Sequence, residues 1–202
     1  MKIVGLTGSI GMGKSATADL FREAGIPVFD SDACVHALYA PGGGAVDAVG
    51  AAFPGVVHEG GIDRDRLSAA LKEDPAGFER LEAIVHPLVA EARHGFLETA
   101  RASGKPFAIL DIPLLFETGG HDAVDAVIVV HAPHDVRRAR VLKRPGMTED
   151  KLDAIIARQL DDHLKIARAD YTIETSGGLE DARKQVEKII EALTGSAQRS
   201  ES

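Results

Sequence analysis

Residues 8–15 read Gly8-Ser9-Ile10-Gly11-Met12-Gly13-Lys14-Ser15 and match the pattern G-x-x-x-x-G-K-S/T at each fixed position. An apolar run at residues 3–6 precedes them, and a segment with Leu20, Phe21 and Ala24 at helical spacing follows. A strand, a glycine-rich loop and a helix in this order form the context in which the pattern binds phosphate. The sequence therefore predicts an α/β fold built around a phosphate-binding loop, or P-loop.

This P-loop is expected to bind a nucleoside triphosphate together with Mg2+. Glycine has no Cβ, so the backbone N–H groups of the loop can curl around a phosphate. Lys14 adds a positive charge, the N-terminus of the following helix directs its free N–H groups at the same anion, and the Ser15 hydroxyl is placed to hold Mg2+. The predicted nucleotide-binding residues are Gly8, Gly11, Met12, Gly13, Lys14, Ser15 and Ala16.

The composition limits the classes of protein to which the chain can belong. Its 202 residues suffice for one core with a small insertion, and its net charge of -8 argues against nonspecific binding to nucleic acid. We expect a cytoplasmic protein, because no apolar stretch could span a bilayer and the P-loop follows the first residues too closely for a signal peptide. The single cysteine, Cys34, excludes an internal disulfide.

A second predicted strand, at residues 26–29, leads into Asp30-Ser31-Asp32. In open α/β sheets the carboxyl ends of the strands are where ligands bind. Asp and Ser also favour the N-cap of a helix, so one of these residues is expected to cap. We expect a carboxylate of this pair to take part in chemistry or to bind metal as well.

The next segment is predicted to be a helical insertion at about residues 33–104. Residues 41–61 are rich in Gly and Ala and suggest a loosely specified connection, and helical pieces begin at Arg64 and Pro75. His86-Pro87 is expected to interrupt the helical pattern, because proline disfavours helix at the residue before it. A longer helix then runs to about Ala102, and a block of this length exceeds one crossover connection.

Two further buried strands are predicted at residues 107–112 and 124–130, with Asp111 near the end of the first. Asp111 is a candidate to assist Mg2+ through a water molecule, and a purely structural role is the alternative. Glu117, in the loop that follows, is interpreted as a solvated acid, and the alternative is that it holds a basic group of the substrate domain.

Residues 135–144 concentrate positive charge in this acidic chain. Arg137, Arg140 and Arg144 stand at i, i+3 and i+7 and are expected to share a helix face. Such a face can close over a γ-phosphate, so we predict a lid at about residues 134–165 with Arg140 and Arg144 as its phosphate-binding pair. The alternative is a solvated surface.

The C-terminal part completes the fold with a short strand at residues 171–173 and a helix at residues 179–193. Residues 195–202 are small and polar and are expected to form a disordered tail. The fold class is thus a three-layer α/β P-loop kinase fold at residues 1–194, with a parallel sheet of about five strands, a helical substrate-binding insertion and a lid.

Taken together, the chain resembles the dephospho-coenzyme A kinase family over nearly its whole length. The resemblance comprises the P-loop, Asp30 and Asp32, 61–64 with Leu67, Leu81-Glu82, His86-Pro87-Leu88, 113–117, the lid arginines, Gln159 and 169–171. It implies transfer of the ATP γ-phosphoryl group to the ribose 3'-hydroxyl of dephospho-coenzyme A, with ATP and Mg2+ required.

The resemblance also assigns roles to individual positions. Asp32 corresponds to the catalytic acid, and His86 lies where the coenzyme substrate would bind, with a structural turn residue as the alternative for His86. The charges of Lys14 and Arg140 suggest that these two residues are catalytic as well. One departure concerns Thr175-Ser176-Gly177, which stands where family members commonly have an Asn-containing turn near adenine. The base preference is therefore left open, as is the oligomeric state.

Two other functions are consistent with the motifs alone. The first is another P-loop kinase, acting on a nucleotide or a metabolite hydroxyl. The second is a noncatalytic nucleotide-binding switch, but a guanine-reading Asn-Lys-x-Asp element is impossible because the chain contains no asparagine.

Overall fold

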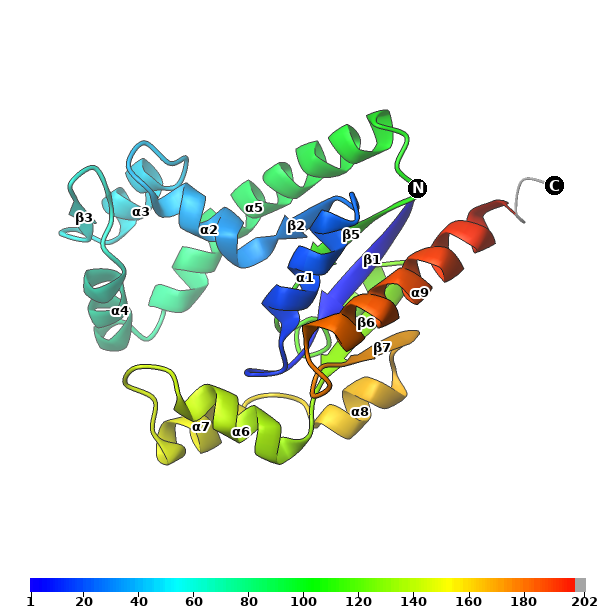
Figure 1. The fold of residues 1–202 in the computed structure, drawn as a ribbon. Coiled ribbons are helices and arrows are strands. Elements are labelled where there is room, and N and C mark those ends of the chain that lie inside the picture. Colours follow the sequence, from blue (N-terminus) through cyan, green and yellow to red (C-terminus); the bar gives the residue numbers. More distant parts are fainter. Residues whose placement is uncertain (199–202) are drawn as a thin grey trace. The chain divides into compact units, whose positions relative to one another are not determined.

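A computed structural model describes residues 1–198, and its internal contacts divide the chain into two compact units (Figure 1). The sheet unit is made of Met1–Phe29 together with residues 100–198, and the helical unit is Asp30–Thr99. The helical unit is thus inserted in sequence between the second strand of the sheet and the next one. The sequence pattern predicted this insertion at residues 33–104.

The sheet unit contains five strands in the order β2 (Val28–Asp30), β5 (Phe107–Asp111), β1 (Lys2–Thr7), β6 (Ala126–His131) and β7 (Tyr171–Glu174). β1 lies between β5 and β6 and is parallel to both, with Leu6 opposite Asp111 on one side and Ile128 on the other. β6 is in turn parallel to β7. The predicted parallel sheet of about five strands is therefore confirmed.

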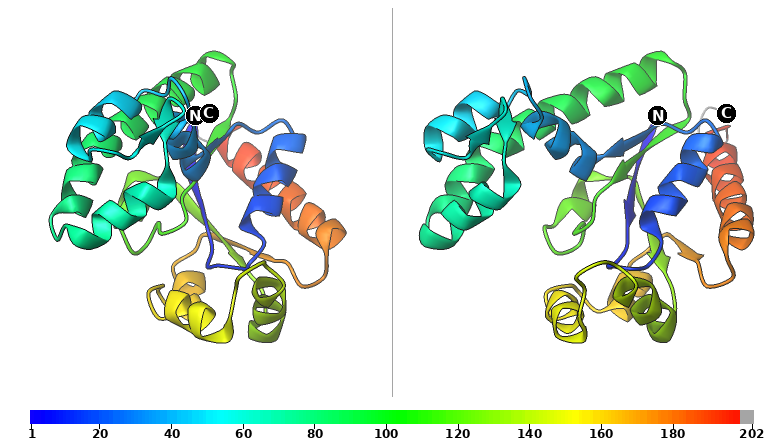
Figure 2. Two further views of the ribbon diagram at one scale, coloured as in Figure 1. Left: turned by 90° about the vertical axis from the view of Figure 1, so that its left-hand side faces the viewer. Right: turned by 60° about the vertical axis from the view of Figure 1, so that its left-hand side comes forward.

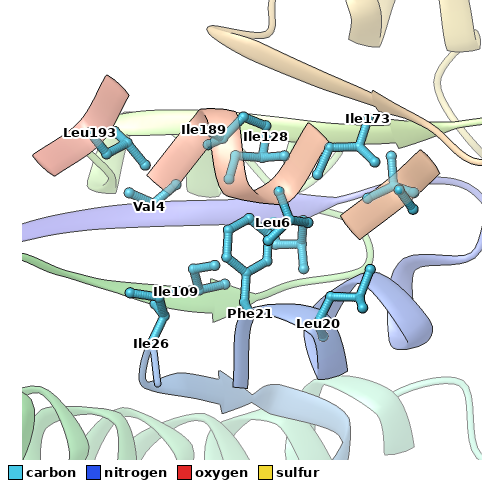
Figure 3. Packing of buried hydrophobic residues seen from close by; sticks show 14 of the residues in the cluster. Val4, Leu6, Leu20, Phe21, Ile26, Ile109, Ile128, Ile173, Ile189 and Leu193 are labelled. Carbon is cyan, nitrogen blue, oxygen red and sulfur yellow. The ribbon is translucent and has the colours of Figure 1, made fainter. Parts of the chain in front are cut away.

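Helices α1 (Lys14–Glu23) and α9 (Leu179–Gln198) cover one face of the sheet and lie side by side (Figure 2). Alternate residues of the strands point into this layer, because side chains along a strand alternate between the two faces. Figure 3 shows the packing of the buried cluster, in which Phe21 of α1 lies close to Leu6 of β1. This cluster is the main core of the sheet unit, and its labelled members are Val4, Leu6, Leu20, Phe21, Ile26, Ile109, Ile128, Ile173, Ile189 and Leu193.

The opposite face is covered by the segment after β5, which includes the short helix η1 (Gly120–Ala123), and by α8 (Asp162–Ala167). Leu115 and Phe116 pack there against Val127 and Val129 of β6. A Cβ at Gly5 would lie 2.7 Å from Leu115, so glycine at this position permits the close packing of the layer. The three-layer arrangement predicted from the sequence is confirmed.

The helical unit contains α2 (Ser31–Tyr39), α3 (Val46–Ala52), α4 (Arg64–Glu73) and all but the last three residues of α5 (Gly77–Ala102). A two-stranded antiparallel hairpin, β3 (Val57–His58) with β4 (Gly61–Ile62), lies between α3 and α4. The sequence pattern had indicated only a loose connection there, because strands of two residues are too short to show an alternating pattern. The core of the unit is built from Ala45, Val46, Val49, Phe53, Val56, Ile62, Leu67, Leu71 and Val85.

Helix α5 continues through Pro87, so the predicted interruption at His86-Pro87 is wrong. Proline removes one backbone hydrogen bond from a helix, which is a local cost. Apolar side chains on both sides of Pro87 contribute to the core, with Ile84 and Val85 before it and Leu88 and Val89 after it. Their burial offsets the local cost and keeps one continuous helix.

Between β6 and β7 the chain forms α6 (His134–Leu142), α7 (Glu149–Ile156) and α8, within the segment predicted as a lid. Figure 2 shows these helices near the end of the sheet unit where the loop after β1 lies. Helix α9 extends to Gln198, so the expected disorder is wrong for residues 195–198, and residues 199–202 lie outside the described part. Within residues 1–198, none of the helices combines the length and apolar character needed to cross a membrane.

Candidate active site

The P-loop connects β1 to α1 and adopts the backbone conformation that its glycines permit. Gly11 and Gly13 have φ angles of 80° and 90°, in the left-handed region that other residues rarely adopt. A Cβ at Gly8 would lie 2.6 Å from the carbonyl oxygen of Val130, so this position also excludes a side chain. Gly13 precedes the first turn of α1 without a side-chain cap, which leaves N–H groups of that turn available to an anion.

Lys14 forms an ion pair with Asp111 at the end of β5, so the structure brings together two residues singled out from the sequence. Asp111 is only 2% exposed and the Lys14 side chain 17%. The parallel register explains the contact, because Asp111 lies opposite Leu6, two residues before the P-loop. This pairing places both a cation and a carboxylate beside the predicted phosphate site.

A hollow of about 310 Å³ lies beside the P-loop within the sheet unit. Five residues predicted to bind nucleotide line it, namely Gly11, Gly13, Ala16, Arg140 and Arg144. Thr17, Thr175, Gly178, Leu179 and Ala182 complete the lining. The hollow is thus cationic where the lid arginines reach it and apolar at α9, a combination that suits a phosphorylated ligand with an apolar ring system.

Met12 is 2% exposed and holds the P-loop on the sheet rather than facing a ligand with its side chain. Its Sδ accepts a hydrogen bond from the backbone N–H of Ala132 at 3.1 Å. Its carbonyl oxygen accepts one from the Thr175 hydroxyl at 2.8 Å. The Thr175 hydroxyl oxygen and carbonyl oxygen in turn accept hydrogen bonds from Arg140. Sequence reasoning missed this role of Thr175, although its position directly after the last strand pointed to the ligand-binding edge of the sheet.

The three lid arginines do not share one helix face as the spacing predicted. Helix α6 ends at Leu142, so Arg144 lies beyond it. Arg137 is 3% exposed, and its Nε donates to the carbonyl oxygen of Ile10 at 3.1 Å. Arg140 and Arg144 line the hollow, whereas Arg137 contacts the P-loop through Ile10.

Glu117 is not the solvated acid that the sequence suggested, because it forms an ion pair of 2.8 Å with the buried Lys165 of α8. Burial acts to raise the pKa of Glu117, but the hydrogen bonds from Lys165 and from the Leu160 N–H outweigh it and lower the pKa below the ordinary value. The carboxylate is therefore held in its charged form. The contact joins residues 48 positions apart, which local sequence patterns cannot reveal.

The helical unit has a hollow of its own, of about 570 Å³, and both Asp32 and His86 line it. Asp30 caps α2 by accepting a hydrogen bond from the Ala33 N–H at 2.9 Å, whereas Asp32 lies in the first turn. The two acids of the Asp-Ser-Asp sequence thus have different positions, one as a cap and one at a hollow. The other lining residues are Ser31, Val35, Tyr39, Phe78, Leu81, Glu82, Val85, Val89, Ala90 and Arg93.

The lining of this second hollow combines apolar side chains with two carboxylates, a histidine and an arginine. Phe78 is 60% exposed, an unusual exposure for so large an apolar side chain. Glu82, His86 and Arg93 lie along α5 at spacings of four and seven residues and so share one helix face. That spacing could have indicated Arg93 from the sequence, which our prediction missed.

Metal binding by the protein alone has little support in the described structure. Among residues 1–198, no group of three or more His, Cys, Asp or Glu side chains is arranged to hold a metal ion. Ser15 is exposed at the start of α1 and Asp111 is near Lys14, and both offer the oxygen donors that Mg2+ prefers. A magnesium ion here would depend on further oxygen ligands from a bound nucleotide.

Comparison with known proteins gives consistent results over almost the whole chain. A family profile for dephospho-CoA kinase matches residues 2–181. A dephospho-CoA kinase of Rhodopseudomonas palustris (strain BisB18) is 54% identical over 199 residues, 98% of this chain and 99% of the relative. The crystal structure of TT1252 from Thermus thermophilus is 34% identical with a TM-score of 0.78, and the match covers 96% of this chain and 98% of that one. The dephospho-CoA kinase from Campylobacter jejuni, 22% identical with the same coverage and a TM-score of 0.71, shares the fold.

Proposed function

The chain belongs to the dephospho-CoA kinase family, and from this premise we propose which of its residues perform each part of the reaction. Its function is the transfer of the γ-phosphoryl group of ATP to the ribose 3'-hydroxyl of dephospho-CoA, which gives CoA and ADP. In this transfer a bond forms between the 3'-oxygen and the γ-phosphorus, the bond from that phosphorus to the oxygen bridging to ADP breaks, and the hydroxyl proton must be accepted. Each requirement has a candidate residue.

The P-loop binds the phosphates of ATP. Backbone N–H groups between Gly8 and Ala16 surround the β- and γ-phosphates, and the dipole of α1 adds a favourable field. Lys14 places its ammonium between Asp111 and these phosphates, so its present ion pair holds it ready for the ligand. The apolar end of the hollow at Leu179 and Ala182 is suited to the nucleoside.

Mg2+ would be held by Ser15 and, through a water molecule, by Asp111. Both residues provide oxygen donors beside the P-loop, which fits the preference of this ion. The ion supplies charge neutralisation and alignment of the β- and γ-phosphates. The chain itself contributes the hydroxyl, the carboxylate and the orientation of Lys14.

Asp32 accepts the proton of the acceptor hydroxyl. A hydroxyl is a weak nucleophile until its proton has an acceptor, and a carboxylate within hydrogen-bond reach meets that need. Asp32 lines the hollow of the helical unit together with His86 and Arg93, which we assign to binding dephospho-CoA. The apolar side chains of that hollow suit the alkyl arm of the substrate, and the Arg93 guanidinium suits its diphosphate.

Arg140 and Arg144 stabilise the negative charge of the transferring phosphoryl group. Both line the hollow at the P-loop, and this juxtaposition is the observation that carries the assignment of roles. Positive charge placed before the reaction begins lowers the barrier where negative charge spreads over phosphate oxygens. Closure of the segment 134–165 would also exclude water, which would otherwise hydrolyse ATP. A cytoplasmic location and the absence of nucleic-acid partners stay predictions.

An acceptor panel tests this proposal directly. The purified protein is incubated with ATP and Mg2+ and with dephospho-CoA, nucleoside monophosphates or shikimate, and ADP and phosphorylated product are measured. We expect product with dephospho-CoA, phosphorylated at the 3'-position. Product from another acceptor alone would contradict the assignment in favour of a different P-loop kinase, and nucleotide binding without any product would favour a switch protein.

A further inference from the structure

Two buried cations of the sheet unit have no part in the reaction as proposed. Lys165 on α8 is 0% exposed and Arg137 on α6 is 3% exposed. Burial of a charge is costly unless the charge is paired and hydrogen-bonded. Neither side chain is among the residues that line the hollow at the P-loop.

Both cations are connected to Ser9, the second residue of the P-loop. Lys165 Nζ donates to Ser9 Oγ at 3.2 Å and is paired with Glu117 at 2.8 Å. Ser9 Oγ donates to one oxygen of Asp162 at 2.5 Å. The other oxygen of Asp162 accepts a hydrogen bond from Arg137 Nη1 at 2.8 Å. Two cations and two carboxylates therefore form a charge-balanced group around one serine hydroxyl.

The same group fixes the next residue of the P-loop through its backbone. Arg137 Nε donates to the carbonyl oxygen of Ile10 at 3.1 Å. The Ile10 N–H donates to Gln159 Oε1 at 3.2 Å, and this oxygen also accepts from Arg137 Nη2 at 3.1 Å. Both backbone polar groups of Ile10 are thus held by side chains. Movement of residues 9 and 10 would break several of these contacts together.

We propose that Glu117, Arg137, Gln159, Asp162 and Lys165 form a positioning network that holds the P-loop ready for ATP. This inference rests on the proposed function, because it requires that the P-loop binds ATP. A loop whose N–H groups already point at the phosphate position avoids the ordering cost that a flexible loop pays on binding. The network contributes to ATP affinity in this way without touching ATP.

The rival explanation is that the network only stabilises the fold. Its members come from α6, α8, the segment between α7 and α8 and the loop after β5, so they also tie these parts of the sheet unit together. A purely structural role would lower the free energy of unfolding and leave ATP affinity unchanged in the folded fraction. The two explanations therefore differ in the dissociation constant for ATP.

The test compares two adjacent arginines of α6. Arg137→Met removes the contacts to Ile10, Gln159 and Asp162, whereas Arg138→Met removes a residue that is ion-paired with Asp153 at 2.6 Å. The dissociation constant of Mg-ATP is measured by titration calorimetry without acceptor, and amide hydrogen exchange is followed for residues 9–13. We expect Arg137→Met to weaken ATP binding at least about fivefold and to speed exchange, since each lost hydrogen bond counts for about a factor of five.

Gln159→Leu keeps the test decisive if Arg137→Met does not fold. This change removes the acceptor of the Ile10 N–H and creates no unpaired buried charge. We expect ATP affinity to fall about three- to fivefold while the KM for dephospho-CoA stays unchanged. Unchanged ATP affinity in a folded Gln159→Leu protein would overturn the network.

The outcome is separable from that of the acceptor panel. ATP titration needs no acceptor, so the network can be supported even if dephospho-CoA is not phosphorylated. Conversely, phosphorylation of dephospho-CoA together with unchanged ATP affinity in Arg137→Met and Gln159→Leu would support the proposed function and contradict the positioning network. An equal effect of Arg138→Met would also count against it, because that residue makes its ion pair elsewhere.

Discussion

Arg140 holds Thr175 by two hydrogen bonds, from Nη1 to the hydroxyl oxygen at 2.8 Å and from Nη2 to the carbonyl oxygen at 2.7 Å. The Thr175 hydroxyl also donates to the carbonyl oxygen of Met12. A hydroxyl can accept and donate at once, so one threonine links a lid arginine to the P-loop. The proposed phosphate-binding arginine is thereby oriented before any ligand arrives.

Thr175→Val should weaken this link while preserving the shape of the side chain. The change removes the hydroxyl, which leaves the Met12 carbonyl oxygen and one Arg140 nitrogen without this partner. We expect the KM for ATP to rise about fivefold, from the loss of about 1 kcal/mol. Steady-state kinetics check this, with Thr175→Ser as the control that keeps the hydroxyl. Equal kinetics for the Val and Ser variants would refute the role of the hydroxyl.

Arg140→Ala should act mainly on kcat. If the guanidinium neutralises charge that develops on the transferring phosphoryl group, its loss should lower kcat at saturating ATP by about 10²- to 10³-fold. The control is Arg138→Ala, whose guanidinium pairs with Asp153 of α7. Single-turnover measurements separate the chemical step from product release. A change in thermal stability with an unchanged kcat would show that Arg140 has only a structural role.

Asp32→Asn should slow phosphoryl transfer without disturbing ATP binding. An amide cannot accept the hydroxyl proton, so we expect kcat to fall by about 10²- to 10⁴-fold with an unchanged dissociation constant for ATP. Asp47 provides a matched control, because it lies in the first turn of α3 as Asp32 lies in the first turn of α2. Asp47→Asn should keep nearly full activity. Turnover by Asp32→Asn at the level of this control would remove Asp32 from the mechanism.

Removal of Mg2+ should abolish activity, and Ser15 should set the magnesium concentration that is needed. Ser15→Ala removes a hydroxyl ligand, so half-maximal activity should require about tenfold more Mg2+, whereas Ser15→Thr keeps the hydroxyl. Titration of activity with MgCl2 after chelation measures both the loss of activity without Mg2+ and the Mg2+ concentration that gives half-maximal activity. Magnesium curves that coincide for the Ala and Thr variants would exclude Ser15 as a ligand.

The features predicted correctly from the sequence are those that depend on local patterns. The P-loop residues are contiguous, so their order alone places Gly11, Gly13 and Lys14 at the start of a helix. Apolar runs in the sequence predict buried strands, and β1 and β6 are found where such runs predicted them. Arg140 and Arg144 both line the hollow at the P-loop, and their binding of the transferring phosphate stays a prediction.

The features missed depend on contacts between distant residues. Arg137 and Arg140 lie in one short basic segment of the sequence, and the folded positions of Ile10 and Asp162 distinguish the buried Arg137 from the lining residue Arg140. The continuation of α5 through Pro87 was missed for the same reason, since the core that offsets the proline is assembled from several helices. Local propensity is a weak guide where tertiary packing decides.

Glu117→Gln should change how stability depends on pH. Because the pKa of Glu117 is lowered from its ordinary value of 4.5 in the folded protein, the unfolded chain binds this proton more readily. The contribution of the carboxylate is therefore fully present above pH 4.5 and is lost as the pH falls through the folded pKa. At about pH 7 we expect Glu117→Gln to lower the free energy of unfolding by about 1–3 kcal/mol, because buried Lys165 loses its charged partner.

The difference between the parent and Glu117→Gln should shrink as the pH falls below 4.5, since protonated Glu117 then resembles glutamine. Urea unfolding followed by circular dichroism over this range measures it. Glu91→Gln, at an exposed position on α5, is the control and should follow the parent curve throughout. A gap between parent and Glu117→Gln that stays constant into the acid range would show that the stability difference arises from packing rather than from the charge on Glu117.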